Sequence, residues 1–213
     1  MSQAPTRAQD PKASPLWDDI LALDYKTICE KSEATLVQEG PSLKLRLNFL
    51  QGPFIVNPLE RSISSPFQDH SPDYQEQVVL LSYLINAAQG PSPGISGVEI
   101  GPFSIPWGDL FFQGPHALPG HLIAKAYGKV PEKLSKIALG YGAKVHHGNG
   151  FKLKVLPQVE LYFYLEPEDD EFPAEARFNF DSNIIYYLAL DGIFALSNIV
   201  ADFLVNPRTL WAL

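Results

Sequence analysis

Short runs in which apolar and polar side chains alternate recur along the chain and predict β-strands. Residues 43–49 are the clearest example, because every second side chain is apolar, as in a strand with one buried face. Gly-Asn-Gly at 148–150 predicts a hairpin turn, since these residues accept positive φ without strain. The strands predicted in this way are 43–49, 54–56, 151–156, 159–165 and 175–180, with one or two further short strands within 98–105.

Apolar side chains at helical spacing predict several helices. Ser71 is expected to be the N-cap of one of them, with Pro72 at its first position and Asp73 in its first turn. This helix is apolar on almost all sides, which predicts that it is buried at the centre of the protein. Asp191 is expected to cap the last helix. The predicted helices are 16–31, 72–88, 122–127, 130–140 and 192–205.

The arrangement of these elements predicts an α+β fold. Strands joined by hairpins and partly segregated from the helices favour a mainly antiparallel sheet, packed against the buried central helix and the C-terminal helix. A length of 213 residues fits one domain with a full hydrophobic core. Residues 1–15 are polar and predict a flexible N-terminal tail, so the predicted single domain spans residues 16–213.

The charge of the chain argues against a nucleic-acid partner. The net charge is −8, from 24 acidic and 16 basic residues, whereas a nucleic-acid surface needs a concentrated patch of Lys and Arg. Lysines are densest between residues 125 and 154, but at 129, 133 and 136 they have the spacing of a solvated helix face. The single cysteine, Cys29, excludes an internal disulfide and an all-cysteine metal site within one chain.

Nothing in the sequence predicts insertion into a membrane. Residues 1–15 lack the apolar segment of a signal peptide. The longest apolar runs, around residues 78–88 and 193–205, are too short to span a bilayer. We therefore expect a cytoplasmic protein without a membrane partner.

Acidic charge is concentrated in one segment, residues 166–181, which contains seven carboxylates and one arginine. Asp170, Glu171, Glu175 and Asp181 offer the oxygen ligands that Mg²⁺ and Ca²⁺ prefer. The segment lacks the Asp-x-Asp-x-Asp-Gly spacing of a calcium loop. A solvated turn, a docking surface for a basic partner and a divalent-metal or catalytic site are all open interpretations of this acidic hairpin.

Two pairs of histidines differ in what they predict. His116 and His121 lie in a loop stiffened by two Gly and two Pro, where they could ligate a transition metal or a tetrapyrrole metal, or be ordinary loop histidines. His146 and His147 are adjacent. In a strand they would point to opposite faces, so they are not expected to bind one ion together.

Aromatic side chains precede the His116–His121 loop. Trp107 and Phe111 can line an apolar pocket for a planar ligand, with core packing as the alternative. No nucleophile elbow, phosphate-binding loop, dinucleotide fingerprint or zinc-protease motif occurs in the sequence. No catalytic residue is therefore predicted.

Several segments in order along about residues 16–205 resemble a known family. The most specific is Asp169-Asp-Glu-Phe-Pro-Ala-Glu175, followed by Asn179-Phe-Asp-Ser182 and Tyr187-Leu188. Weaker matches are Leu45-Arg-Leu-Asn-Phe-Leu50 with 54–56, Val79-Leu-Leu-Ser-Tyr-Leu-Ile-Asn86, and Ile95-Ser-Gly97 with Phe103. Together they are similar to the prokaryotic family called domain of unknown function 3786.

This resemblance implies a module of largely anaerobic organisms. Some members carry a cysteine-rich iron–sulfur segment ahead of the domain, which implies redox or one-carbon metabolism, a redox or iron–sulfur partner, and a corrinoid, another tetrapyrrole or a divalent metal ion as cofactor. One cysteine cannot build a cluster, so this chain departs from those members. In the shared motif, Phe172 is expected to insert into the core while Pro173 sets the turn.

The favoured hypothesis is therefore a non-enzymatic module that binds a cofactor or small ligand through His116, His121, Trp107 and Phe111. One alternative is a protein-interaction module that uses the acidic hairpin. The other is a divalent-metal-dependent enzyme that uses the carboxylates of Asp170, Glu171, Glu175 and Asp181.

Overall fold

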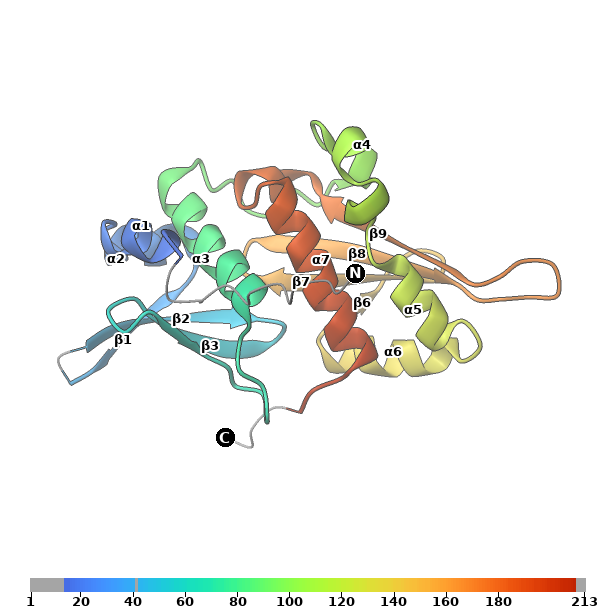
Figure 1. Ribbon diagram of the computed structural model, residues 1–213, viewed down its shortest axis with the longest axis horizontal. Helices are drawn as coiled ribbons and strands as arrows, with labels where there is room; N and C mark the ends of the chain where they lie inside the picture. The colour runs from blue at the N-terminus through green and yellow to red at the C-terminus, as the bar shows by residue number, and fades with distance from the viewer. Residues whose placement is uncertain (1–13, 41, 210–213) are drawn as a thin grey trace, which may run out of the picture.

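The protein consists of two antiparallel sheets and seven α-helices over the residues described by the computed structural model, 14–40 and 42–209 (Figure 1). The predicted α+β class is confirmed, with two sheets where one was expected. Residues 1–13, which make up most of the predicted tail, lie outside the described residues.

The first sheet is a meander of four strands in the order β1-β2-β3-β4. The alternation at 43–49 produces the expected half-buried strand, in which Leu45, Leu47 and Phe49 are buried. The edge strand β1 was not predicted, because its side chains are mostly exposed and its structure depends on pairing with β2. The strands are β1 (Thr35–Glu39), β2 (Ser42–Phe49), β3 (Gly52–Asn57) and β4 (Ser62–Ser64).

The second sheet has five strands in the order β5-β9-β8-β7-β6. The one or two short strands expected within 98–105 are a single strand of two residues, because Pro102 has no N–H to donate and begins a short 3₁₀ helix instead. A hydrogen bond of 3.0 Å from the Leu50 N–H to the Val155 carbonyl joins the two sheets. The strands are β5 (Glu99–Ile100), β6 (Lys144–Val145), β7 (Gly150–Leu156), β8 (Val159–Glu166) and β9 (Glu175–Asp181).

The helices begin at different residues from those predicted. The helix expected at 16–31 is two helices, because Asp24 caps the second one through a 3.0 Å bond from the Thr27 N–H. Asp73, not Ser71, is the N-cap of α3, in a capping box with Glu76. Asp191 lies inside the first turn of α7, after the N-cap Ala189. The helices are α1 (Leu16–Leu21), α2 (Tyr25–Ser32), α3 (Tyr74–Gln89), α4 (Gly108–Phe111), α5 (Gly120–Tyr127), α6 (Pro131–Gly140) and α7 (Leu190–Val205).

One continuous hydrophobic core connects the helices and both sheets. The two longest helices, α3 and α7, pack against each other, and α5 and α7 lie over one face of the five-stranded sheet (Figure 1). Leu161, Phe163 and Phe178 are buried on that face. The opposite face carries the alternate, polar side chains of the same strands.

Candidate functional site

The face of the five-stranded sheet that points away from α5 and α7 is polar but closely packed. Strand register places Tyr162 beside Asn179 and Lys152, and Tyr164 beside Arg177, on this face. Tyr162 is 2% exposed and Tyr164 is 7% exposed. Polar side chains that are this well buried need hydrogen-bond partners. The Tyr162 hydroxyl donates to Glu160 on the same strand at 3.2 Å, whereas the Tyr164 hydroxyl donates to Glu99, which identifies the site.

Tyr164, Asn179 and His146 converge on the carboxylate of Glu99 in β5. One carboxylate oxygen, Oε1, accepts bonds from the Tyr164 hydroxyl at 2.7 Å and the Asn179 amide at 2.6 Å. The other, Oε2, lies 2.9 Å from Nε2 of His146. Glu99 and His146 are largely buried, with 20% and 18% of their side chains exposed. The carboxylate is therefore fixed in position by three neighbours from three other segments.

The contact between Glu99 and His146 shows that the sheet is curled. Glu99 lies in one outer strand, and His146 directly follows the other outer strand. In a flat sheet, four steps of about 4.8 Å would separate the outer strands by about 19 Å. Glu and His side chains cannot bridge that distance, so the outer strands must curve toward each other over the polar face. This curvature explains why Tyr162 is buried although no helix covers it.

His147 joins Glu99 and His146 to form a group with the composition of a metal site. Each of the three offers one ligand atom, and these atoms all lie within 4.8 Å of one another. Within residues 14–40 and 42–209, no other group of His, Cys, Asp and Glu meets this criterion. His147 is the exposed member, so the group opens to solvent on one side. We call Glu99, His146 and His147 the carboxylate–histidine cluster.

The expectation that His146 and His147 point apart is wrong. Strand β6 ends at Val145, so the two histidines belong to the turn before β7, where the alternation of a strand does not apply. Their ring centroids lie 3.5 Å apart. The turn therefore brings both imidazoles to the same side of the sheet.

The hydrogen bonds set the protonation of the Glu99 carboxyl. Burial alone would raise the pKa of Glu99, but the bonds from Asn179, Tyr164 and His146 outweigh it and lower the pKa of this carboxyl below its ordinary value. Burial, followed by the bond to Glu99, raises the pKa of Tyr164 to about 12. At neutral pH the cluster therefore holds an ionised carboxylate beside a protonated phenol.

Asp181 holds the loop that leads into Glu99. It is 1% exposed. Its carboxylate accepts bonds from the Ser96 N–H (3.0 Å) and hydroxyl (2.8 Å), the Gly97 N–H (2.7 Å) and the Asn183 N–H (3.0 Å). Donors thus surround Asp181, which lies at the opposite end of β9 from Glu175. The structure does not bring it together with the other predicted carboxylate ligands.

The remaining acidic candidates lie on the part of the β8–β9 hairpin that projects from the body (Figure 1). Asp170, Glu171 and Glu175 are exposed there. Asp169 organises the turn by accepting bonds from the N–H groups of Glu171 and Phe172. The expected insertion of Phe172 into the core is wrong, because this ring is 65% exposed at the tip of the hairpin.

The predicted cofactor residues are distributed over separate places. The His116 ring stacks on Phe111 at 4.6 Å between ring centroids, and Phe111 packs against the core. His121 lies on α5 and lines a surface hollow with Lys125 and Lys129. Trp107 is 74% exposed and adopts a left-handed backbone conformation with φ of 65°. Among the described residues, neither His116 nor His121 belongs to a group of three or more His, Cys, Asp and Glu side chains placed to share a metal ion.

Sequence reasoning missed the carboxylate–histidine cluster because its members are far apart. Glu99 and His146 are separated by 47 positions, and no local spacing connects them. One signal was present in the sequence. Two histidines directly before Gly-Asn-Gly belong to a turn rather than a strand, and a turn can present neighbouring side chains on one side.

The fold and site define an α+β protein with a polar cluster on the open face of a curled sheet. Residues 24–203 match the model of a family described as Domain of unknown function (DUF3786), so the chain belongs to this family. The predicted resemblance is confirmed. No curated protein and no solved structure matches the chain. No helix of the described part of the chain is long and apolar enough to cross a membrane.

Proposed function

We propose that the protein is a metal-binding module that holds a divalent first-row transition ion at Glu99, His146 and His147. The observation that carries this proposal is the convergence of three potential ligand atoms within 4.8 Å. One comes from the edge strand β5, and the other two come from the turn that follows the opposite edge strand, β6. Two imidazoles and one carboxylate suit zinc and its neighbours better than Mg²⁺ or Ca²⁺, which prefer oxygen ligands alone.

The surroundings of Glu99 are also those of a metal ligand. The Asn179 amide donates to Oε1 of its carboxylate, the Tyr164 hydroxyl lies 2.7 and 2.9 Å from the two oxygens, and Oε2 faces His146. Outer partners of this kind fix ligand geometry in metal sites and are as important as the ligands themselves. The lowered pKa of Glu99 keeps the carboxylate ionised, as metal binding requires. Three protein ligands and an open side leave room for a further ligand from solvent.

The test is a zinc titration of the full chain, purified without a histidine tag and freed of metal. Wild-type protein should bind one Zn²⁺ per chain by isothermal titration calorimetry. Glu99→Gln, His146→Ala and His147→Ala should each lower the affinity by about tenfold or more, which corresponds to about 1.4 kcal/mol. Co²⁺ should give a visible absorption spectrum that the same variants lose.

Two control variants make this test specific. His121→Ala removes another exposed histidine outside the cluster, and Glu171→Gln removes a carboxylate of the acidic hairpin. Both should bind zinc as the wild type does. If Glu171→Gln abolishes binding and Glu99→Gln does not, the ion is held by the acidic hairpin and the proposal is wrong. Unchanged binding in all three cluster variants would refute it as well.

The proposed metal-binding module agrees in kind with the ligand-binding module predicted from the sequence, but it uses other residues. We further propose that the module works in the cytoplasm with a redox or iron–sulfur partner. Under the proposal, the ligand site is the carboxylate–histidine cluster rather than His116, His121, Trp107 and Phe111. The description of the matching family, Domain of unknown function (DUF3786), names no activity, so the proposal assigns no catalytic role.

A second candidate function is protein docking through the acidic hairpin. Its support is the exposure of Phe172 on a hairpin that projects from the body (Figure 1), directly after the exposed acidic residues Asp170 and Glu171. An exposed aromatic side chain next to several carboxylates fits a partner with an apolar pocket and a basic rim. The base of the hairpin contacts the turn between α5 and α6, where the Glu168 N–H donates to the Gly128 carbonyl at 3.2 Å and the Glu168 carboxylate pairs with the exposed Lys129 at 3.3 Å.

A photocrosslinking amino acid at position 172, introduced in the native host, tests this second function. It should capture one defined protein, with a yield that falls steeply as salt is raised. The matched control is the same amino acid at Leu59, which is 66% exposed and remote from the hairpin in sequence. Equal capture at both positions, or capture that salt does not change, would rule out docking through the hairpin.

A further inference from the structure

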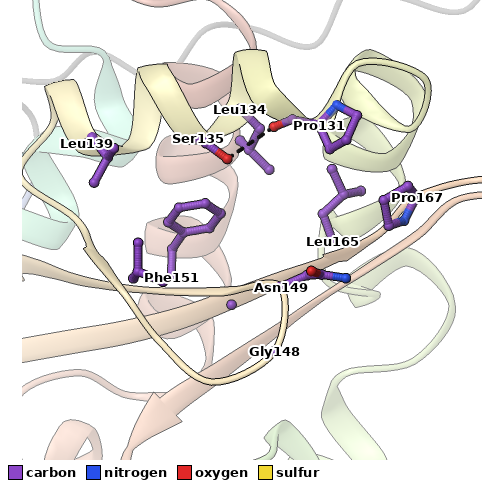
Figure 2. Close-up of a pocket in the computed structure, with 11 residues that line it drawn as sticks. Pro131, Leu134, Ser135, Leu139, Gly148, Asn149, Phe151, Leu165 and Pro167 are labelled. Atoms are coloured by element: carbon purple, nitrogen blue, oxygen red, sulfur yellow. Dashed lines mark hydrogen bonds between the residues drawn. The ribbon is translucent and has the colours of Figure 1, made fainter.

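A cavity of about 250 Å³ lies between α6 and the turn that joins β6 to β7. Figure 2 shows Leu134 and Ser135 descending from α6 and Phe151 rising toward them from the sheet, with Leu165 and Pro167 at one end and Asn149 below. Leu134 and Phe151 are buried, whereas Leu139 and Val145 at its edge are 52% and 73% exposed. The cavity is thus closed at its base and open toward solvent.

The chemistry of the wall restricts what can occupy this cavity. None of its lining side chains is charged, so an ion inside it would lose hydration without gaining a partner. The Ser135 hydroxyl donates to the Pro131 carbonyl, and the Asn149 amide donates to Glu166. The wall therefore suits an apolar body, with the Asn149 side chain at the mouth available to a single polar group.

The volume restricts the occupant further. A cavity of 250 Å³ holds about eight water molecules at their liquid volume of about 30 Å³ each. That space is too small for a peptide segment and fits a molecule of about ten non-hydrogen atoms. The exposed Leu139 and Val145 would be covered by such a molecule, which adds apolar burial to its binding.

We infer that this cavity is a binding site for a small neutral molecule with an aromatic or branched aliphatic body and one hydrogen-bonding group. The site lies on the helix-covered side of the sheet, and the carboxylate–histidine cluster lies on the other side. The two share one turn: Gly148 and Asn149 line the cavity, and His146 and His147 directly precede them.

The shared turn couples the two sites. The ring of Tyr164 packs so closely on Gly150 that a Cβ atom at position 150 would lie 2.5 Å from it. The hydroxyl of Tyr164 binds Glu99. A ligand that shifts the turn from the cavity side therefore moves both histidines relative to Glu99. This coupling rests on the proposed metal function, whereas the cavity as a binding site does not.

Indole is a suitable probe, because it is neutral, aromatic and carries one N–H donor. Binding to the metal-free full chain should be visible by saturation-transfer NMR at millimolar indole. Ser135→Phe fills the cavity from α6 and should weaken binding at least tenfold, while Ser135→Ala at the same position should retain it. Leu139→Trp, at an exposed edge position, serves as a second filling variant if Ser135→Phe does not fold.

The coupling is then measured as the zinc affinity with and without saturating indole. A change of about fivefold or more, in either direction, is expected from the usual range of coupling between sites. It should disappear in Ser135→Phe. Indole binding without any change in zinc affinity refutes the coupling. The cavity site is refuted if the wild-type chain does not bind indole. It is also refuted if Ser135→Phe and Leu139→Trp both bind indole as tightly as the wild type does. Indole binding by a chain that does not bind zinc leaves the cavity site valid and refutes the metal function alone.

Discussion

Asp181 should be among the residues that contribute most to stability, because its carboxylate is buried and fully engaged. It is 1% exposed and accepts bonds from the Ser96 N–H and hydroxyl and from the N–H groups of Gly97 and Asn183. Replacing it by alanine would leave these donors without their acceptor and would release the loop that leads into Glu99.

The magnitude follows from these contacts. Hydrogen bonds to a charged group contribute about 1.5–3 kcal/mol each, but they are not additive when they share one acceptor. Asp181→Ala removes the charge and leaves only neutral donors, and those of Ser96 and Gly97 belong to exposed residues, where water can replace part of the loss. We therefore expect Asp181→Ala to lower the free energy of unfolding by about 2–4 kcal/mol, out of a total of about 5–15 kcal/mol for a domain of ordinary stability.

Urea denaturation followed by circular dichroism measures this change. Asp170→Ala is the matched control, because Asp170 is an exposed aspartate of the same hairpin, and it should change stability by less than about 0.5 kcal/mol. The loss in Asp181→Ala should be the same with and without a chelator, because Asp181 binds protein donors. A loss below about 1 kcal/mol would refute the structural role, and a loss that disappears with chelator would show that Asp181 holds a metal ion.

Three further predictions concern other parts of the structure. Gly150→Ala should lower the free energy of unfolding by about 1–3 kcal/mol, measured by urea denaturation, and should weaken zinc binding, because the new Cβ would lie 2.5 Å from the Tyr164 ring. Unchanged stability would contradict this packing. Burial raises the pKa of Glu76, so the carboxyl contributes stability that is present below its unfolded pKa and is lost as pH rises through the folded value. Glu76→Gln should therefore lose less stability than the wild type between pH 4 and 8, and parallel pH profiles would refute this. Phe203→Ala should lower the free energy of unfolding by about 3–5 kcal/mol, as measured by thermal and urea unfolding. The reason is that the buried Phe203 ring packs under the Arg208 guanidinium at 3.9 Å.

Much of the fold was accessible from local patterns, and the errors have local causes as well. The alternation of apolar and polar residues predicted β2, β7, β8 and β9, because each of these strands has a buried face. The edge strand β1 has no such face and is defined by pairing with β2. The predicted starts of two helices were wrong because several polar residues near each start could act as the N-cap. The structure shows that Asp24 and Asp73 accept the first helical N–H groups, which composition alone does not predict.

The sequence by itself determined the α+β class, the buried central helix, the acidic hairpin and the family. These properties depend on residues that are neighbours along the chain, where periodicity and turn chemistry act directly. Only the tertiary structure decided where the candidate site lies. Glu99 meets His146 because the sheet curls, and the curl results from the twist and packing of five strands together. The cavity behind the histidine turn likewise exists only where α6 packs over the sheet, since packing between distant elements creates contacts that no local pattern encodes.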